Sequence, residues 1–200
     1  MSTIWLGKYS TPNKERNIKT LGGRLAKAIH QAIGASRKNR FASPSLEWKT
    51  SLFDIPCRIR KPNPAWRKVI ADSSQPVHER VYNACKLGAW LDRRHLRRQA
   101  AVSLKLGPCQ VIHLPGEVFV EYQLYGQQLQ PSRFLAFTAL GDCTAGYLPT
   151  ARAFDEGGYE PSELATVTTP AIERKLKKAI ASVAIAGMAT RRTVQNRQKM

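Results

Sequence analysis

Two short polar segments lie where active sites are commonly found in layered α/β proteins, directly after apolar runs. The first is His113–Glu117 (HLPGE), which ends in a carboxylate, and the second is Gly141–Thr150 (GDCTAGYLPT), which contains Tyr147. Sites in open α/β sheets form beyond the carboxyl ends of the strands. If the two preceding strands are parallel neighbours, we expect Glu117 to meet the loop that contains Tyr147.

The apolar runs before these segments predict β-strands. Ala101–Leu106 and Cys109–Leu114 are separated by a Gly-Pro pair, which predicts two strands joined by a tight turn. Arg133–Leu140 (RFLAFTAL) predicts a third, strongly apolar strand. Glu117–Leu129 predicts a helix, and the start of a helix favours a negative charge.

Helices are predicted to flank this sheet. Apolar residues recur at helical spacing after Pro12 and again after Pro170. The order of elements predicts an α/β fold, a layered sheet with flanking helices, in which residues 1–187 form one unit and 188–200 form a basic flexible tail. The other expected elements are an extended segment with a strand at Ser45–Arg60, helices at Ala65–Ala71, Val77–Leu96 and Ala171–Met188, and a glycine-rich loop from Gly141 to about Glu160.

The charge of the chain is large but unevenly distributed. The formal net charge is +18, a balance that taken alone indicates a polyanionic partner. The segment 106–170 holds two basic and seven acidic residues, a net charge of −5, so the remainder carries +23. The excess of basic residues lies in the flanking helices and the tail, away from the distinctive residues of the 106–170 segment. A nucleic-acid partner is therefore not expected. One basic cluster, interpreted as a solvated helix face or an anionic contact, consists of Arg93, Arg94, Arg97 and Arg98.

The cysteine spacing and the N-terminus indicate in which cell compartment the chain is expected. The four cysteines are far apart and include no Cys-x-x-Cys, which argues against a zinc ribbon or a disulfide scaffold. They are interpreted as buried thiols in a reducing compartment, with one pairing left open. The N-terminus lacks the pattern of a signal peptide, and no apolar run is long enough to span a membrane, so a cytoplasmic chain is expected.

The motifs around the two polar segments resemble the neutral/alkaline ceramidase family, in particular its bacterial ceramidase-like members. The motifs are LPGEVFVEYQLYGQQL and, about ten residues later, FLAFTALGDCTAGYLPTARAFDEGGYE. Within them the family elements are Pro115-Gly116-Glu117, Gly146–Thr150 and Tyr159-Glu160. With the GKYS segment at Gly7–Ser10, the resemblance covers the chain from about Gly7 to Ile185 and implies the C-terminal part of a catalytic domain.

The resemblance implies a zinc site. In that family two histidines, one glutamate and one tyrosine hold the metal, and Glu117 and Tyr147 match the glutamate and the tyrosine. Zinc-bound hydroxide then attacks the carbonyl of an N-acyl linkage, as in ceramide. Residues expected to orient ligands or to order the loop over the site are His113, Asp142, Tyr159 and Glu160.

The family's histidine ligands lie in the half of the domain that precedes this sequence. The four histidines of this chain form no His-x-His or His-x-x-x-His pair, so the sequence resembles a truncated member. An upstream half-domain or a companion chain is the partner that would supply histidines, and a lipid-like N-acyl compound is the expected substrate. Family members are often exported. The alternatives are a basic protein that binds nucleic acid or an anionic surface, and a non-catalytic structural remnant of the hydrolase fold.

Overall fold

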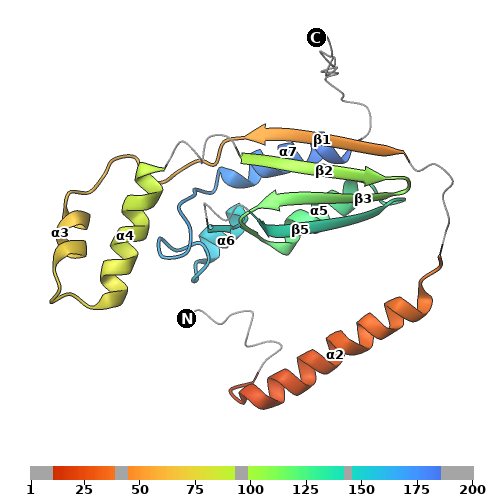
Figure 1. The fold of residues 1–200 in the computed structure, drawn as a ribbon, viewed down its shortest axis with the longest axis horizontal. Coiled ribbons are helices and arrows are strands. Elements are labelled where there is room, and N and C mark those ends of the chain that lie inside the picture. The colour runs from red at the N-terminus through yellow and green to blue at the C-terminus, as the bar shows by residue number, and fades with distance from the viewer. Residues whose placement is uncertain (1–10, 39–44, 93–98, 142–145, 186–200) are drawn as a thin grey trace, which may run out of the picture.

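The computed structural model describes residues 11–38, 45–92, 99–141 and 146–185 (Figure 1). No helix in these ranges is both long enough and apolar enough to cross a membrane. The helices are α2 (Lys14–Ala35), α3 (Ala65–Ala71), α4 (Val77–Leu91), α5 (Val120–Leu129), α6 (Ala151–Glu156) and α7 (Ile172–Ala184). The strands are β1 (Leu46–Phe53), β2 (Gln99–Leu106), β3 (Cys109–Pro115), β4 (Glu117–Val118), β5 (Phe134–Gly141) and β6 (Tyr147–Leu148).

A four-stranded mixed sheet forms the centre of the molecule, with strand order β1-β2-β3-β5. The pairs β1–β2 and β2–β3 are antiparallel, whereas β3 and β5 are parallel neighbours. The tight turn predicted between β2 and β3 is confirmed, and Gly107 adopts φ +57° in it, a conformation that glycine tolerates best. A second, two-stranded parallel sheet pairs β4 with β6 beyond the ends of β3 and β5.

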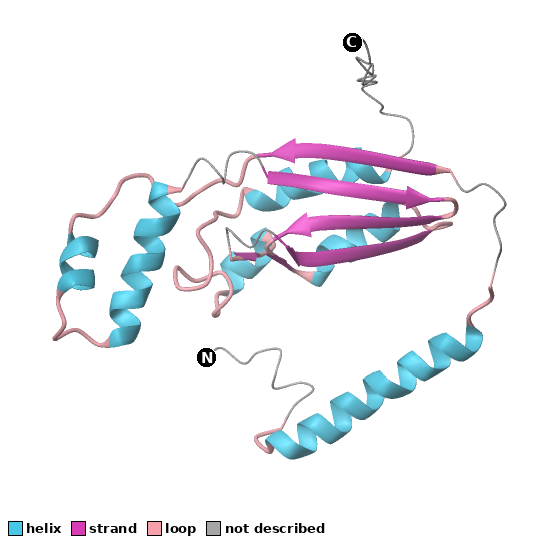
Figure 2. Cartoon of the chain, viewed as in Figure 1, coloured by secondary structure: helices cyan, strands magenta, loops and turns pink. Residues whose placement is uncertain are grey.

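Helices α5 and α7 cover one face of the four-stranded sheet (Figure 2). Helix α7 buries an apolar stripe at helical spacing, as its sequence predicts. Opposite it, alternate residues of β3 such as Ile112 and Leu114 are fully buried. The predicted α/β class, a layered sheet with flanking helices, is therefore confirmed. The buried residues of α7 are Ile172, Leu176, Ala179, Ile180, Val183 and Ala184.

The opposite face of this sheet is apolar and, within the described residues, exposed. The side chains of Leu46 and Trp48 on β1 and Phe134 on β5 are 67–69% exposed. Helix α2 is amphipathic, as predicted, and begins at the N-cap Asn13, whose side chain accepts a hydrogen bond from the Arg16 amide. Its apolar stripe is exposed as well, at Ile18, Leu21, Leu25, Ile29 and Ile33.

Several predicted boundaries were wrong. The helix expected from Glu117 begins only at Val120, because Glu117 and Val118 form strand β4 instead. The loop expected from Gly141 contains β6 and helix α6. The thiols expected to be buried are exposed at Cys85 and Cys109 and half-buried at Cys57. Expectations that fall outside the described residues concern Gly7–Ser10, the 93–98 cluster, Asp142, Cys143 and the 188–200 tail.

Candidate functional site

Gly116 allows the chain to pass from β3 into β4 at the carboxyl edge of the sheet. It adopts φ +73°, and a Cβ atom there would lie 2.9 Å from the Gly146 carbonyl oxygen. Its amide donates to the Gly141 carbonyl (3.0 Å), and its carbonyl accepts from the Leu140 amide (2.9 Å). This backbone pairing places the next residue, Glu117, beyond the ends of both parallel strands.

Gly146 has the equivalent role before β6. Its φ is +65°, and a Cβ atom would approach the Ala165 carbonyl oxygen to 2.3 Å, which is too close for any side chain. The next residue, Tyr147, donates its amide to that same Ala165 carbonyl (3.1 Å). The Thr166 hydroxyl donates to the Tyr147 carbonyl (2.6 Å). Two hydrogen bonds therefore hold the backbone of Tyr147 against the 165–166 segment.

The parallel pairing of β4 with β6 brings Glu117 and Tyr147 together. The two residues are register partners, as are Val118 and Leu148. Leu148 is fully buried, and Val118 packs against the core, so by strand alternation Glu117 and Tyr147 share the other face. A side-chain hydrogen bond from the phenol to the carboxylate raises the pKa of Tyr147, with desolvation and the negative charge of Glu117 adding to the effect. Burial of the Tyr147 ring is only partial.

We expect the substitution Glu117→Gln to lower the pKa of Tyr147 toward its ordinary value of 10.0, because it removes the charged acceptor. Tyrosine labelled at Cζ with ¹³C allows this phenol to be followed by NMR during a pH titration. Since the folded-state pKa is raised, the pair stabilises the fold below about pH 10 and loses this effect as the phenol ionises. An unchanged titration of Tyr147 in the variant would contradict the hydrogen bond.

Two of the expected accessory residues lie beside the pair. The Tyr159 ring packs edge-on against the Tyr147 ring, with centroids 6.2 Å apart. The Glu160 carboxylate lies close enough to contribute to the raised pKa of Tyr147. The loop that follows α6 therefore returns to the site.

His113 lies at the end of β3, on the exposed face of the sheet. Its Nδ1 atom is 3.1 Å from the Thr138 hydroxyl on β5. Its ring occupies the space where a Cβ atom on Gly141 would lie, at distances of 2.3–2.8 Å. The imidazole is thus held against the end of β5, at the edge where the site forms.

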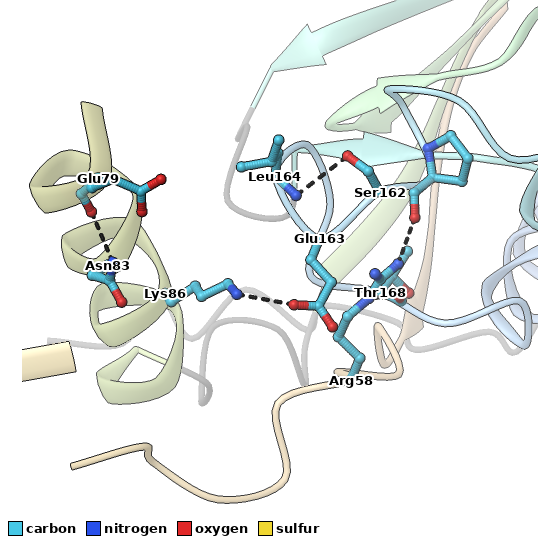
Figure 3. A network of polar contacts seen from close by, with 9 residues as sticks. Arg58, Glu79, Asn83, Lys86, Ser162, Glu163, Leu164 and Thr168 are labelled. Carbon is cyan, nitrogen blue, oxygen red and sulfur yellow. Dashed lines mark hydrogen bonds and ion pairs between the residues drawn. The ribbon is translucent and has the colours of Figure 1, made fainter. Parts of the chain in front are cut away.

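A polar network supports the segment that carries Thr166 (Figure 3). Arg58 donates to the carbonyl oxygens of Thr168 (2.8 Å) and Pro161 (2.9 Å). Lys86 of α4 forms an ion pair with Glu163 at 2.9 Å. These contacts join residues separated by 77 to 110 positions, and no motif in the sequence pointed to them.

A buried phenol anchors the other side of the site. Tyr122 of α5 is fully buried and donates its hydroxyl to the Pro149 carbonyl at 2.9 Å. Burial raises the pKa of this phenol strongly, so it remains a hydrogen-bond donor. The sequence carries no local signal for this hydrogen bond, because the partner carbonyl lies 27 positions away.

A cavity of about 320 Å³ opens where β4 and β6 continue into α5 and α6. Its walls include Phe119, two residues after Glu117, and Thr150, three residues after Tyr147. Val120 and Ala153 add apolar surface, and the remaining walls are formed by Glu121, Arg152 and Glu156.

The Glu117–Tyr147 pair fits part of a zinc site. Zinc binds oxygen ligands at about 2.0–2.2 Å, so two oxygens on one tetrahedral ion are roughly 3.4 Å apart. This is wider than the roughly 2.5–3.0 Å of an O–H···O hydrogen bond, so the hydrogen-bonded pair would have to open slightly to share an ion. Structural and catalytic zinc sites need at least three protein ligands. The described residues contain no group of three or more His, Cys, Asp or Glu side chains able to hold a metal ion. These residues therefore provide two oxygen donors and not a complete zinc site.

The fold is similar to that of solved ceramidases. A structure of a ceramidase complexed with C2 matches 88% of this chain with a TM-score of 0.54 and 12% sequence identity. The neutral ceramidase from Pseudomonas aeruginosa matches 92% of it with a TM-score of 0.48 and 12% identity. This chain spans about a third of the length of those proteins, 35% and 34% respectively. No protein-family model matches the sequence, and no curated protein matches it.

Proposed function

We propose that the chain is the glutamate- and tyrosine-bearing part of a ceramidase-like, zinc-dependent amidohydrolase. The observation that carries the proposal is the contact of the Glu117 carboxylate with the Tyr147 phenol, at the carboxyl edge of two parallel strands. These residues come from segments thirty positions apart, and two glycines with positive φ are required to bring them together. The ceramidase-like fold adds support for this class of reaction.

Glu117 and Tyr147 are the residues that would hold zinc. When bound, the metal supplies an activated water and a polarised amide carbonyl. The remaining ligands are proposed to be histidines from another polypeptide segment, either a half-domain or a companion chain. Until that segment docks, the phenol keeps its proton and donates a hydrogen bond to the Glu117 carboxylate, which keeps the two side chains together.

The substrate is proposed to be a lipid-like N-acyl compound. The cavity beside the site has apolar walls at Phe119, Val120 and Ala153, suited to a hydrocarbon chain. The hydroxyl of Thr150 is held by its own N-cap contact, since it accepts from the Ala153 amide at 3.3 Å. The cavity wall is therefore fixed to the start of α6.

The experiment is hydrolysis of an N-acyl sphingosine by the chain expressed together with its flanking genomic coding sequence, with zinc supplied. We expect Glu117→Gln and Tyr147→Phe each to lower kcat/KM at least about 100-fold, the scale of losing one transition-state contact or ligand. The matched controls are Asp155→Asn, an exposed carboxylate on α6, and Tyr82→Phe, a phenol on α4. Full activity in either site variant would contradict the proposal that the substituted residue holds zinc.

A further inference from the structure

We propose that the free edge of β1, with the groove beside it, binds an extended acidic peptide segment that adds to the sheet as a further strand. This surface is separate from the candidate zinc site, because β1 and β5 lie at opposite edges of the sheet. The proposal therefore stands or fails independently of the proposed hydrolase.

Strand β1 has one paired and one open side. It pairs with β2 along its whole length, from Leu46 opposite Leu106 to Phe53 opposite Gln99. Within the described residues the sheet order ends at β1, and no other strand pairs with its outer side. An eight-residue edge strand with free amide and carbonyl groups is a template for an added strand.

A groove runs along the end of this open side. It has a volume of about 690 Å³, which is within the range of about 300–1,000 Å³ usual for binding sites. One wall is the end of β1 from Ser51 to Phe53 together with the next residue, Asp54, and the other wall is α7. The helix contributes Arg174, Lys175, Lys178, Ala179 and Ser182.

The charge of the groove selects an acidic partner. Arg174, Lys175 and Lys178 line it, and none of them forms an ion pair with another described residue. Lys177, on the same helix, is already paired with Glu173. Among the residues that the structure describes, the groove therefore presents three cations without an ion-pair partner and one carboxylate, Asp54. Carboxylates on a bound segment would pair with these cations in a partly enclosed site.

The two faces of β1 define the pattern of the segment. Phe53 is buried toward α7, whereas Trp48 and Leu52 point to the other face and are 67% and 56% exposed. In an added strand, alternate side chains would lie on these same two faces. Acidic residues would face Arg174 and Lys178, and apolar residues would cover Trp48 and Leu52. The expected partner is a segment with alternating acidic and apolar residues.

The experiment uses the full chain and two fluorescent heptapeptides of equal composition and charge. One alternates (Glu-Val-Glu-Val-Glu-Val-Glu), and the other is blocked (Glu-Glu-Glu-Glu-Val-Val-Val). By anisotropy we expect at least about tenfold tighter binding of the alternating peptide. We expect the double variant Arg174→Gln/Lys178→Gln to bind the alternating peptide at least about tenfold more weakly. The control Lys19→Gln/Lys27→Gln on α2 removes the same number of positive charges, and we expect it to bind the peptide as tightly as the native chain does.

Amide exchange distinguishes strand addition from simple charge attraction. The alternating peptide is expected to slow exchange of β1 backbone amides, because they gain hydrogen-bond partners. Equal affinity for the two peptides, or equal loss in the α2 control, would overturn the proposal. So would a single-stranded oligonucleotide that binds the groove more tightly than the alternating peptide, since it cannot pair with a β-strand.

Discussion

Replacing Gly146 with alanine is expected to destabilise the folded chain by about 3 kcal/mol. Alanine at a positive φ costs roughly 1–2 kcal/mol. The new Cβ would also lie 2.3 Å from the Ala165 carbonyl oxygen, which is backbone and cannot rotate away. Relieving that clash moves β6 and adds a cost of about 1–3 kcal/mol, as for other overpacked sites. Urea unfolding followed by circular dichroism measures the free energy of unfolding.

The matched control for this prediction is Gly107→Ala. Gly107 has a similar φ of +57°, but a Cβ atom there meets nothing within 4 Å. We expect this variant to lose only the backbone contribution, about 1–2 kcal/mol. The difference between the two losses in free energy of unfolding measures the effect of the close approach of Gly146 to Ala165. If both variants lose the same free energy, β6 does not lie against the 165–166 segment as described.

Replacing Leu176 with alanine is expected to cost about 2–5 kcal/mol, the range found for buried leucines that leave a cavity. Leu176 is fully buried in the cluster between α7 and the sheet. The same substitution at Leu164, which is 62% exposed, should change the free energy of unfolding by less than about 0.5 kcal/mol. Thermal or urea unfolding compares the two variants. Comparable losses would show that α7 is not the helix that covers the sheet.

The central sheet was largely predictable from the sequence because its signals are local. Apolar runs bounded by Gly and Pro located β2, β3 and β5, and the helical spacing of Leu176 and Ile180 located the buried face of α7. The meeting of Glu117 with the loop of Tyr147 was predicted on the condition that the preceding strands are parallel neighbours. The structure meets that condition, since β3 and β5 pair in parallel.

The parts that were not predicted depend on contacts distant in the sequence. Glu117 and Val118 continue an apolar, helix-like segment, yet they form a strand because β6 offers them a parallel partner. Leu140 adopts φ +70° at the end of β5, where two residues of β5, Ala139 and Leu140, lie opposite one residue of β3, Leu114. Bulges are common beside functional sites. A leucine at this position gives no indication of one in the sequence.

The groove beside β1 has no local signal in the sequence either. The sequence placed part of the basic excess in the flanking helices, but helical spacing alone does not reveal what lies next to a helix. In the structure Arg174 and Lys178 lie one turn apart beside an edge strand. Three cations of the chain therefore lie beside the outer side of β1, which no other described strand pairs with.

The zinc-site account is tested most directly by the ionisation of Tyr147 in the presence of metal. Zinc is added to the full chain with an excess of imidazole, which provides nitrogen donors in place of the histidines proposed to come from another segment, and the ¹³Cζ resonance of Tyr147 is recorded at neutral pH. Because a bound cation lowers the pKa of a coordinated phenol, we predict that Tyr147 shifts to the phenolate position in the native chain and stays a phenol in the Glu117→Gln variant. A Tyr147 resonance that remains that of the protonated phenol at saturating zinc would contradict the claim that Glu117 and Tyr147 share a metal.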